Sequence, residues 1–215
     1  MKKVILILTV LLFPAIAFSA HKDGFTLNLK TSGSFVKELG GIATMPFDSE
    51  YSIYLKNTTE RRCSARVFID GARVSPMGDF VIGPNDELDL ERFVTDLAEG
   101  KRFKFVPLSN PNIDDPTRAE NGIVIVEFRF EKKPIWHPPE IEWGEFEDKL
   151  FYPEDFGSVT LDEATINVDT NCITSVSSTS AGATIGGSNS IQAFHKVDYD
   201  FEDEFVTLKL KIEGI

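Results

Sequence analysis

Short runs in which apolar and polar residues alternate recur along this chain, and they constrain its fold more than any other feature. Residues 25–30, 51–56 and 205–212 alternate in this way, and the last run reads Phe-Val-Thr-Leu-Lys-Leu-Lys-Ile. A period of two is typical of a strand with one buried face. Because no segment keeps a helical period over about twelve residues, the pattern argues against a fold built from long amphipathic helices.

The residues between these runs favour tight turns. An Asp-Gly pair at 70–71 follows an apolar run at 63–69, and Gly-Pro-Asn-Asp at 83–86 follows another at 80–82. Residues 122–130 begin as a continuous apolar run and end in alternation, as expected for a central strand that leaves the core. We therefore predict an all-β fold, an antiparallel β-sandwich of jelly-roll or immunoglobulin-like type, with about eight to ten strands and long irregular loops.

The first nineteen residues predict export. A basic pair at 2–3 precedes an apolar run at 4–13, and small residues follow it. Ten apolar residues are too few to cross a bilayer, which takes about 20, so residues 1–19 are predicted to be a secretory signal peptide and not a membrane span. Cleavage after Ala17 or Ser19 places small residues at both required positions. The protein is expected outside the cell or on its surface, with the periplasm as an alternative.

Residues 20–47 are predicted to be an N-terminal arm that carries one strand. Glycines and a proline at 33–46 give this arm the composition of a spacer. Such an arm can add its strand to the sheet of a neighbouring subunit, with Phe25, Leu27 and Leu29 as the inserted side chains. The alternative is that the strand pairs within its own domain.

The predicted sandwich domain spans residues 48–215 and contains two irregular segments. Residues 132–156 combine prolines, acidic residues and both tryptophans of the chain, and residues 170–190 are rich in Ser, Thr and Gly, which predicts a flexible loop. A strand is expected at 191–197. Exposed aromatic rings stack on sugars or anchor protein interfaces. The first segment thus supplies a candidate surface for a protein partner or a glycan, unless its rings pin it to the sandwich: Trp136, Trp143, Phe146 and Tyr152.

Two cysteines, Cys63 and Cys172, suit one disulfide in an oxidising compartment. The bond would close a loop of about 110 residues and contribute at most about 5 kcal/mol in the chain-entropy model. Two separate buried thiols are the alternative.

The segment Tyr51–Arg92 is similar to a loosely defined family of uncharacterised bacterial and phage-associated β-rich proteins. The similarity lies in Tyr-Ser-Ile-Tyr-Leu-Lys-Asn, Arg-Arg-Cys, Phe-Ile-Asp-Gly, Val-Ile-Gly-Pro and Leu-Asp-Leu-Glu-Arg, read in order. A Gly- and Ser-rich stretch at 182–190 and the final alternating strand complete it. The resemblance implies an all-β module with a structural or attachment role, and it implies no activity or catalytic residues.

Motifs for catalysis are absent from the sequence. The chain has three histidines and lacks G-x-S-x-G, H-E-x-x-H and P-loop patterns. A net charge of −12 disfavours a nucleic-acid partner. One enzymatic alternative remains, a copper-dependent secreted oxygenase. If cleavage followed Ala20, the free amine and ring of His21 could bind copper together with His137 or His195.

Taken together, the sequence predicts a secreted protein that is not an enzyme and needs no metal or other cofactor. Its expected role is that of a subunit of an extracellular filament or matrix fibre, assembled by strand donation from the N-terminal arm. The expected partner is a second copy of the chain. The alternative is a monomeric adhesin that recognises a glycan or a host-surface protein.

Overall fold

The computed structural model describes residues 20–133 and 179–215, and these residues contain no helix. The predicted all-β fold is confirmed. Within the described ranges there are 14 strands: β1 (Ala20–Lys22), β2 (Phe25–Thr31), β3 (Ser34–Phe35), β4 (Glu38–Leu39), β5 (Ile42–Met45), β6 (Glu50–Asn57), β7 (Cys63–Ile69), β8 (Ala72–Arg73), β9 (Phe80–Ile82), β10 (Glu87–Leu90), β11 (Gly100–Pro107), β12 (Ile123–Phe130), β13 (Ser180–Ser190) and β14 (Val206–Gly214).

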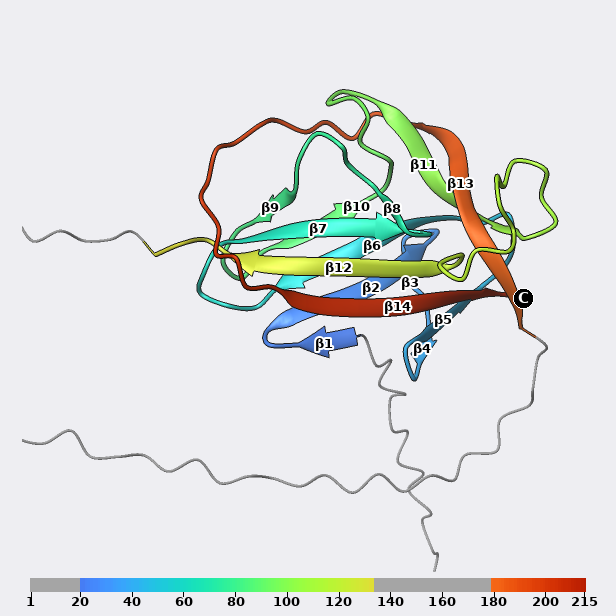
Figure 1. Cartoon of the computed structure of the whole chain (residues 1–215), viewed down its shortest axis with the longest axis horizontal. Coiled ribbons are helices and arrows are strands. Elements are labelled where there is room, and N and C mark those ends of the chain that lie inside the picture. Colours follow the sequence, from blue (N-terminus) through green and yellow to red (C-terminus); the bar gives the residue numbers. More distant parts are fainter. Residues whose placement is uncertain (1–19, 134–178) are drawn as a thin grey trace, which may run out of the picture. The chain divides into compact units, whose positions relative to one another are not determined.

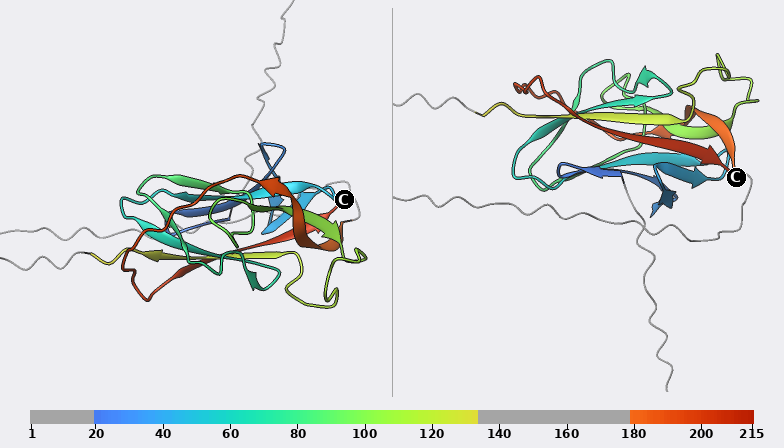
Figure 2. Two further views of the ribbon diagram at one scale, coloured as in Figure 1. Left: turned by 90° about the horizontal axis from the view of Figure 1, so that it is seen from above. Right: turned by 60° about the horizontal axis from the view of Figure 1, so that its bottom comes forward.

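The strands form two layers that are joined into one sheet through β13 (Figures 1 and 2). The order is β1-β2-β6-β11-β13-β14-β12-β7-β8, so β13 pairs with β11 on one side and with β14 on the other. Pairing is antiparallel except between β5 and β14, which run parallel. The sheet does not close into a barrel, consistent with the predicted sandwich.

The core lies between the layers and follows the alternation seen in the sequence. In β12 the side chains of Val124, Val126 and Phe128 are buried, while the residues between them are partly exposed. Phe25 of β2 stacks on Phe128 with the ring centroids 4.4 Å apart, which ties the two layers together near one end. The apolar residues that predicted these strands therefore form the buried face of each layer.

The N-terminal residues are part of this core, and the prediction of a separate arm with one strand at 20–47 is wrong. Five strands, β1 to β5, fall in that range. β2 pairs with β6 of the same chain at every position from Phe25 to Thr31. The side chains of Phe25, Leu27 and Leu29 are fully buried, so removing β2 would open the core.

The expected flexible loop at 170–190 is also wrong where the structure describes it. Residues 180–190 form β13, which runs alongside β11 for most of its length. Gly182 makes this pairing possible, because a Cβ there would lie 2.5 Å from the carbonyl oxygen of Val106. The expected strand at 191–197 is wrong too, because that stretch has no regular secondary structure.

Candidate functional site

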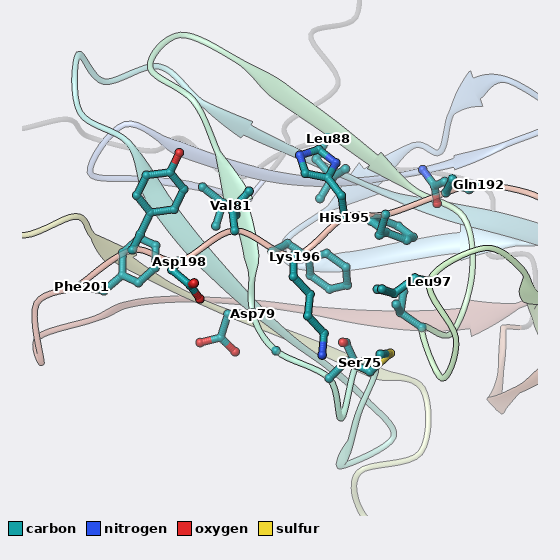
Figure 3. A pocket seen from close by; sticks show the side chains of 18 residues that line it. Ser75, Asp79, Val81, Leu88, Leu97, Gln192, His195, Lys196, Asp198 and Phe201 are labelled. Carbon is teal, nitrogen blue, oxygen red and sulfur yellow. The ribbon is translucent and has the colours of Figure 1, made fainter.

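A pocket of about 590 Å³ opens beside the edge of the sandwich formed by β9. One wall is β9, whose second edge pairs with no strand in the described ranges, and another is β10. The residues 191–205, here called the crossing segment, connect β13 to β14 and pass over this opening (Figure 1). Figure 3 shows the side chains that line the pocket, which come from the crossing segment, β9, β10 and the loops beside them.

The lining of the pocket is mixed in character. Apolar contacts come from Phe80, Leu88, Leu97 and Phe194, with Ser75, Asp79, Gln192, His195, Lys196 and Asp198 adding polar groups at its wall and rim. Phe80 and Phe194 lie 5.6 Å apart between ring centroids, so they form a continuous aromatic floor. A surface of this kind binds apolar groups and orients them with a few polar contacts.

Arg92 anchors the start of the crossing segment. Its side chain is fully buried and donates two hydrogen bonds to the carbonyl oxygen of Gln192, at 2.7 and 2.8 Å. Further bonds reach the carbonyl oxygens of Phe93, Asp96 and Glu99, at 2.7 to 3.1 Å. Since a buried guanidinium is costly unless its donors are satisfied, this arrangement fixes both the loop after β10 and the crossing segment.

Beyond this anchor the crossing segment is held at few points. The amide of Phe194 donates to the carbonyl oxygen of Leu97 at 2.8 Å, and the next bonds between backbone groups are those of Asp200 and Glu202, with Lys132 and Phe130. The described residues provide no backbone partner for positions 195–199. The middle of the segment thus leaves its own backbone groups available beside the open edge of β9.

Four charged side chains meet next to the pocket. Asp79 accepts hydrogen bonds from Arg66, Arg73 and Arg129, with the closest atoms 2.5 to 3.0 Å apart. Burial alone would raise the pKa of Asp79, but the arginines outweigh it and lower the pKa below its ordinary value. The group joins β7, β8 and β12 to the loop before β9, and it fixes the outer wall of the pocket.

The pocket does not contain an assembled catalytic triad. Ser75, His195 and Asp198 all line it, but no hydrogen bond joins the ring of His195 to either of the others in the described part of the chain. No group of three His, Cys, Asp or Glu residues close enough to hold a metal ion was found within the described ranges.

The predicted site residues are placed only in part. Trp136, Trp143, Phe146 and Tyr152 lie outside the described residues, as does Cys172. Cys63 lies fully buried at the start of β7, and burial raises the pKa of its thiol to about 12.

The histidines proposed for copper are placed in part as well. The exposed His21 lies in β1, and its ring nitrogen Nδ1 is 3.0 Å from the hydroxyl of Thr26. His195 lines the pocket, and His137 is outside the described residues. Within the described ranges of the chain, no helix has the length and apolar character needed to span a membrane.

No family model matches this chain, and the comparisons with curated proteins and with solved structures give no match either. The site must therefore be interpreted from its own residues. Sequence reasoning missed it because its walls are about a hundred positions apart. One signal was present: apolar residues recur at 191, 194, 197, 199, 201 and 205 in a stretch that is otherwise strongly polar.

Proposed function

We propose that this protein is an exported, non-catalytic structural subunit that associates with further copies of itself through apolar surfaces. The observation that supports this most is the crossing segment. Four of its large apolar side chains are exposed, and the second and third of them line the pocket: Ile191, Val197, Tyr199 and Phe205. Ile191 is 87% exposed and Phe205 is 58% exposed, and apolar side chains that gather on one exposed segment are typical of a surface that contacts another protein.

The mode of association differs from the one expected from the sequence. Donation of the N-terminal strand between copies would require β2 to leave β6 and to expose three fully buried side chains. Surfaces that are already exposed need no such rearrangement, so they are the better candidates for contact between subunits. Strand exchange by β2 stays possible only as a domain swap, in which β2 makes the same pairing with a second copy.

Sedimentation velocity of the complete mature chain over a wide range of concentration tests this function, together with electron microscopy of cell-surface material. We expect species larger than the monomer, and fibres that contain the protein. A monodisperse monomer that binds glycans on an array would contradict the proposal and favour the adhesin alternative.

A variant in the crossing segment provides the molecular test. Val197→Asp places a charge on a side chain that is 43% exposed and lines the pocket, so it should weaken association without disturbing the core. Ser109→Asp is the matched control, because Ser109 is exposed on the loop after β11 and makes no side-chain contact in the described hydrogen-bond network. Equal association of the two variants would argue against the crossing segment as a contact surface.

A further inference from the structure

Resting on the proposed self-association, we infer that the contact is made between two different surfaces: the hairpin of β4 and β5 in one copy enters the pocket beside the crossing segment of the next. This names the occupant of the pocket, a second copy of the chain, and the part of that copy that fills it. Three observations carry the inference: the grouping of exposed apolar side chains, the shape of the hairpin and the charges around both surfaces.

The large apolar side chains that are exposed in the described residues fall into two groups. One group belongs to the pocket and the crossing segment: Met77, Ile191, Val197, Tyr199 and Phe205. The other lies on or next to β3, β4 and β5: Phe35, Leu39 and Ile215. The β4–β5 hairpin and the crossing segment lie at different sides of the sandwich in Figure 1.

The second group lies on or next to a projecting hairpin, whereas three members of the first group line a pocket. Figure 1 shows the β4–β5 hairpin extending beyond the sheets. Its turn, Gly40-Gly41, has φ angles of +61° and +81°, a conformation that other residues rarely adopt. The amide of Lys211 in β14 donates to the carbonyl oxygen of Gly41 at 2.8 Å, which holds the turn in place. Leu39, just before the turn, is 67% exposed and is thus presented on a fixed support.

The crossing-segment end of the pocket and the flank of the hairpin differ in charge, whereas the outer wall of the pocket carries three arginines around Asp79. Five of the seven residues at 198–204 in the crossing segment are acidic. Two of the five form ion pairs in the described residues, Asp200 with Lys132 and Glu202 with Arg61. The remaining three, Asp198, Asp203 and Glu204, form no ion pair among the described residues. Asp198 lines the pocket together with Lys196, and the other two follow in the crossing segment, so this end of the segment has a negative excess.

Beside the hairpin, two exposed lysines form no ion pair among the described residues. Lys37 precedes β4 and is exposed, and Lys209 is exposed on β14, two residues before the position that pairs with Ile42 of β5. The acidic group of the hairpin, Glu38, is turned inward and accepts a hydrogen bond from the amide of Ala20 at 2.9 Å. The basic flank of the hairpin therefore complements the acidic end of the pocket, which favours a second copy of this chain as the occupant.

Because the hairpin and the pocket are different surfaces, a subunit that uses one of them in a contact keeps the other one free. A subunit whose pocket is filled still presents its hairpin, so copies add head to tail, and the product is an open chain unless the rotation closes a ring. A contact between like surfaces would end at a dimer. The arrangement therefore accounts for a filament with one kind of interface.

A mixing experiment with complete mature chains tests this geometry. Leu39→Asp removes the hairpin surface and keeps the pocket, and Val197→Asp does the reverse. Each variant alone should sediment as a monomer, and an equimolar mixture should give a one-to-one heterodimer that grows no further. Ser109→Asp should assemble as the unsubstituted chain does. Circular dichroism and the melting temperature of each variant check that it folds.

The outcomes separate this inference from the proposed function. If the unsubstituted chain assembles and Leu39→Asp assembles equally well, the hairpin is not the occupant and only the inference fails. A mixture of folded variants that stays monomeric overturns it as well, since one intact pair of surfaces is then insufficient. If the unsubstituted chain is a monomer at every concentration, both the inference and the proposed function fail.

Discussion

At the scale of single residues, one arginine holds together parts of the chain that are a hundred positions apart. Arg92 lies in the Leu-Asp-Leu-Glu-Arg motif noted in the sequence, and all of its hydrogen bonds reach backbone carbonyl oxygens. Gly100 leaves the space that it needs, because a Cβ there would lie 2.6 Å from the guanidinium nitrogen Nη1. The motif is therefore a structural anchor for the crossing segment.

Replacing this anchor should destabilise the protein strongly. Arg92→Met removes the donors to four carbonyl oxygens, and we expect the free energy of unfolding to fall by about 3 kcal/mol or more. Arg102→Met is the control, because Arg102 is half-exposed and makes one ion pair, with Glu91 at 2.7 Å, worth less than about 1 kcal/mol. Urea titrations measure both variants. Similar losses in the two would contradict the role given to Arg92.

Asp79 should make stability depend on pH in the acid range. Its pKa is lower in the folded chain than the ordinary value of 3.8, so its contribution is present above that value and is lost as the pH falls through the lowered pKa. At pH 7 we expect Asp79→Asn to cost about 2 kcal/mol, because three arginines lose a charged acceptor. Unfolding titrations from pH 7 to pH 2 should show the two curves converging in the acid range. If the difference in the free energy of unfolding between Asp79→Asn and the unsubstituted chain stayed constant with pH, Asp79 would not be the source of the pH dependence.

At the scale of elements, β13 shows how a strand can have the composition of a loop. Its Ser, Gly and Asn residues have little tendency to form strands, yet it pairs with β11 because Gly182 lets the two backbones approach around the ring of Phe105. Gly186 lies at a position where a Cβ would meet only the side chain of Lys101, at 3.0 Å. The two glycines thus have different structural roles within one strand.

Alanine substitutions at these glycines should separate the two roles. Gly182→Ala forces a Cβ against a backbone carbonyl oxygen and an aromatic ring, so we expect a loss of about 2 kcal/mol in the free energy of unfolding. Gly186→Ala brings its Cβ to 3.0 Å from the Cβ of Lys101, a close contact with no backbone atom, and its effect should stay within about 1 kcal/mol of zero. Thermal and urea unfolding compare the pair. Equal effects would mean that close packing at Gly182 is not what defines the strand.

The alternation of apolar and polar residues predicted the strands that are defined by their own sequence. It failed for segments whose conformation is set by contacts with residues far away in the sequence. The alternating runs at 25–30, 51–56 and 205–212 appear as β2, β6 and β14. The run at 191–197 has the composition of a strand, but Arg92 and the loop after β10 hold it out of the sheet. The pocket was missed for the same reason, since no local pattern records which distant segments will meet.

At the scale of the whole molecule, the N-terminal residues belong to the domain. If residues 20–47 were the separate arm expected from the sequence, deleting residues 20–33 would leave a folded monomer unable to assemble. The structure leads to the opposite expectation, because this deletion removes β1 and β2 and exposes the core face of β6. We expect the truncated chain to be unfolded or aggregated, as judged by circular dichroism and dispersion of its amide resonances. A folded, monomeric product would show that β2 is dispensable.

The shared strand β13 also affects how the molecule opens. β13 is hydrogen-bonded to β11 in one layer and to β14 in the other. Separating either layer from β13 would therefore also disturb the hydrogen bonds between β13 and the strand of the other layer. Solvent deuterons should therefore reach the amides of both partners through a common fluctuation, and their protection factors should rise and fall together when conditions change. The molecule would in this respect behave as one cooperative unit, although its side chains are arranged in two layers.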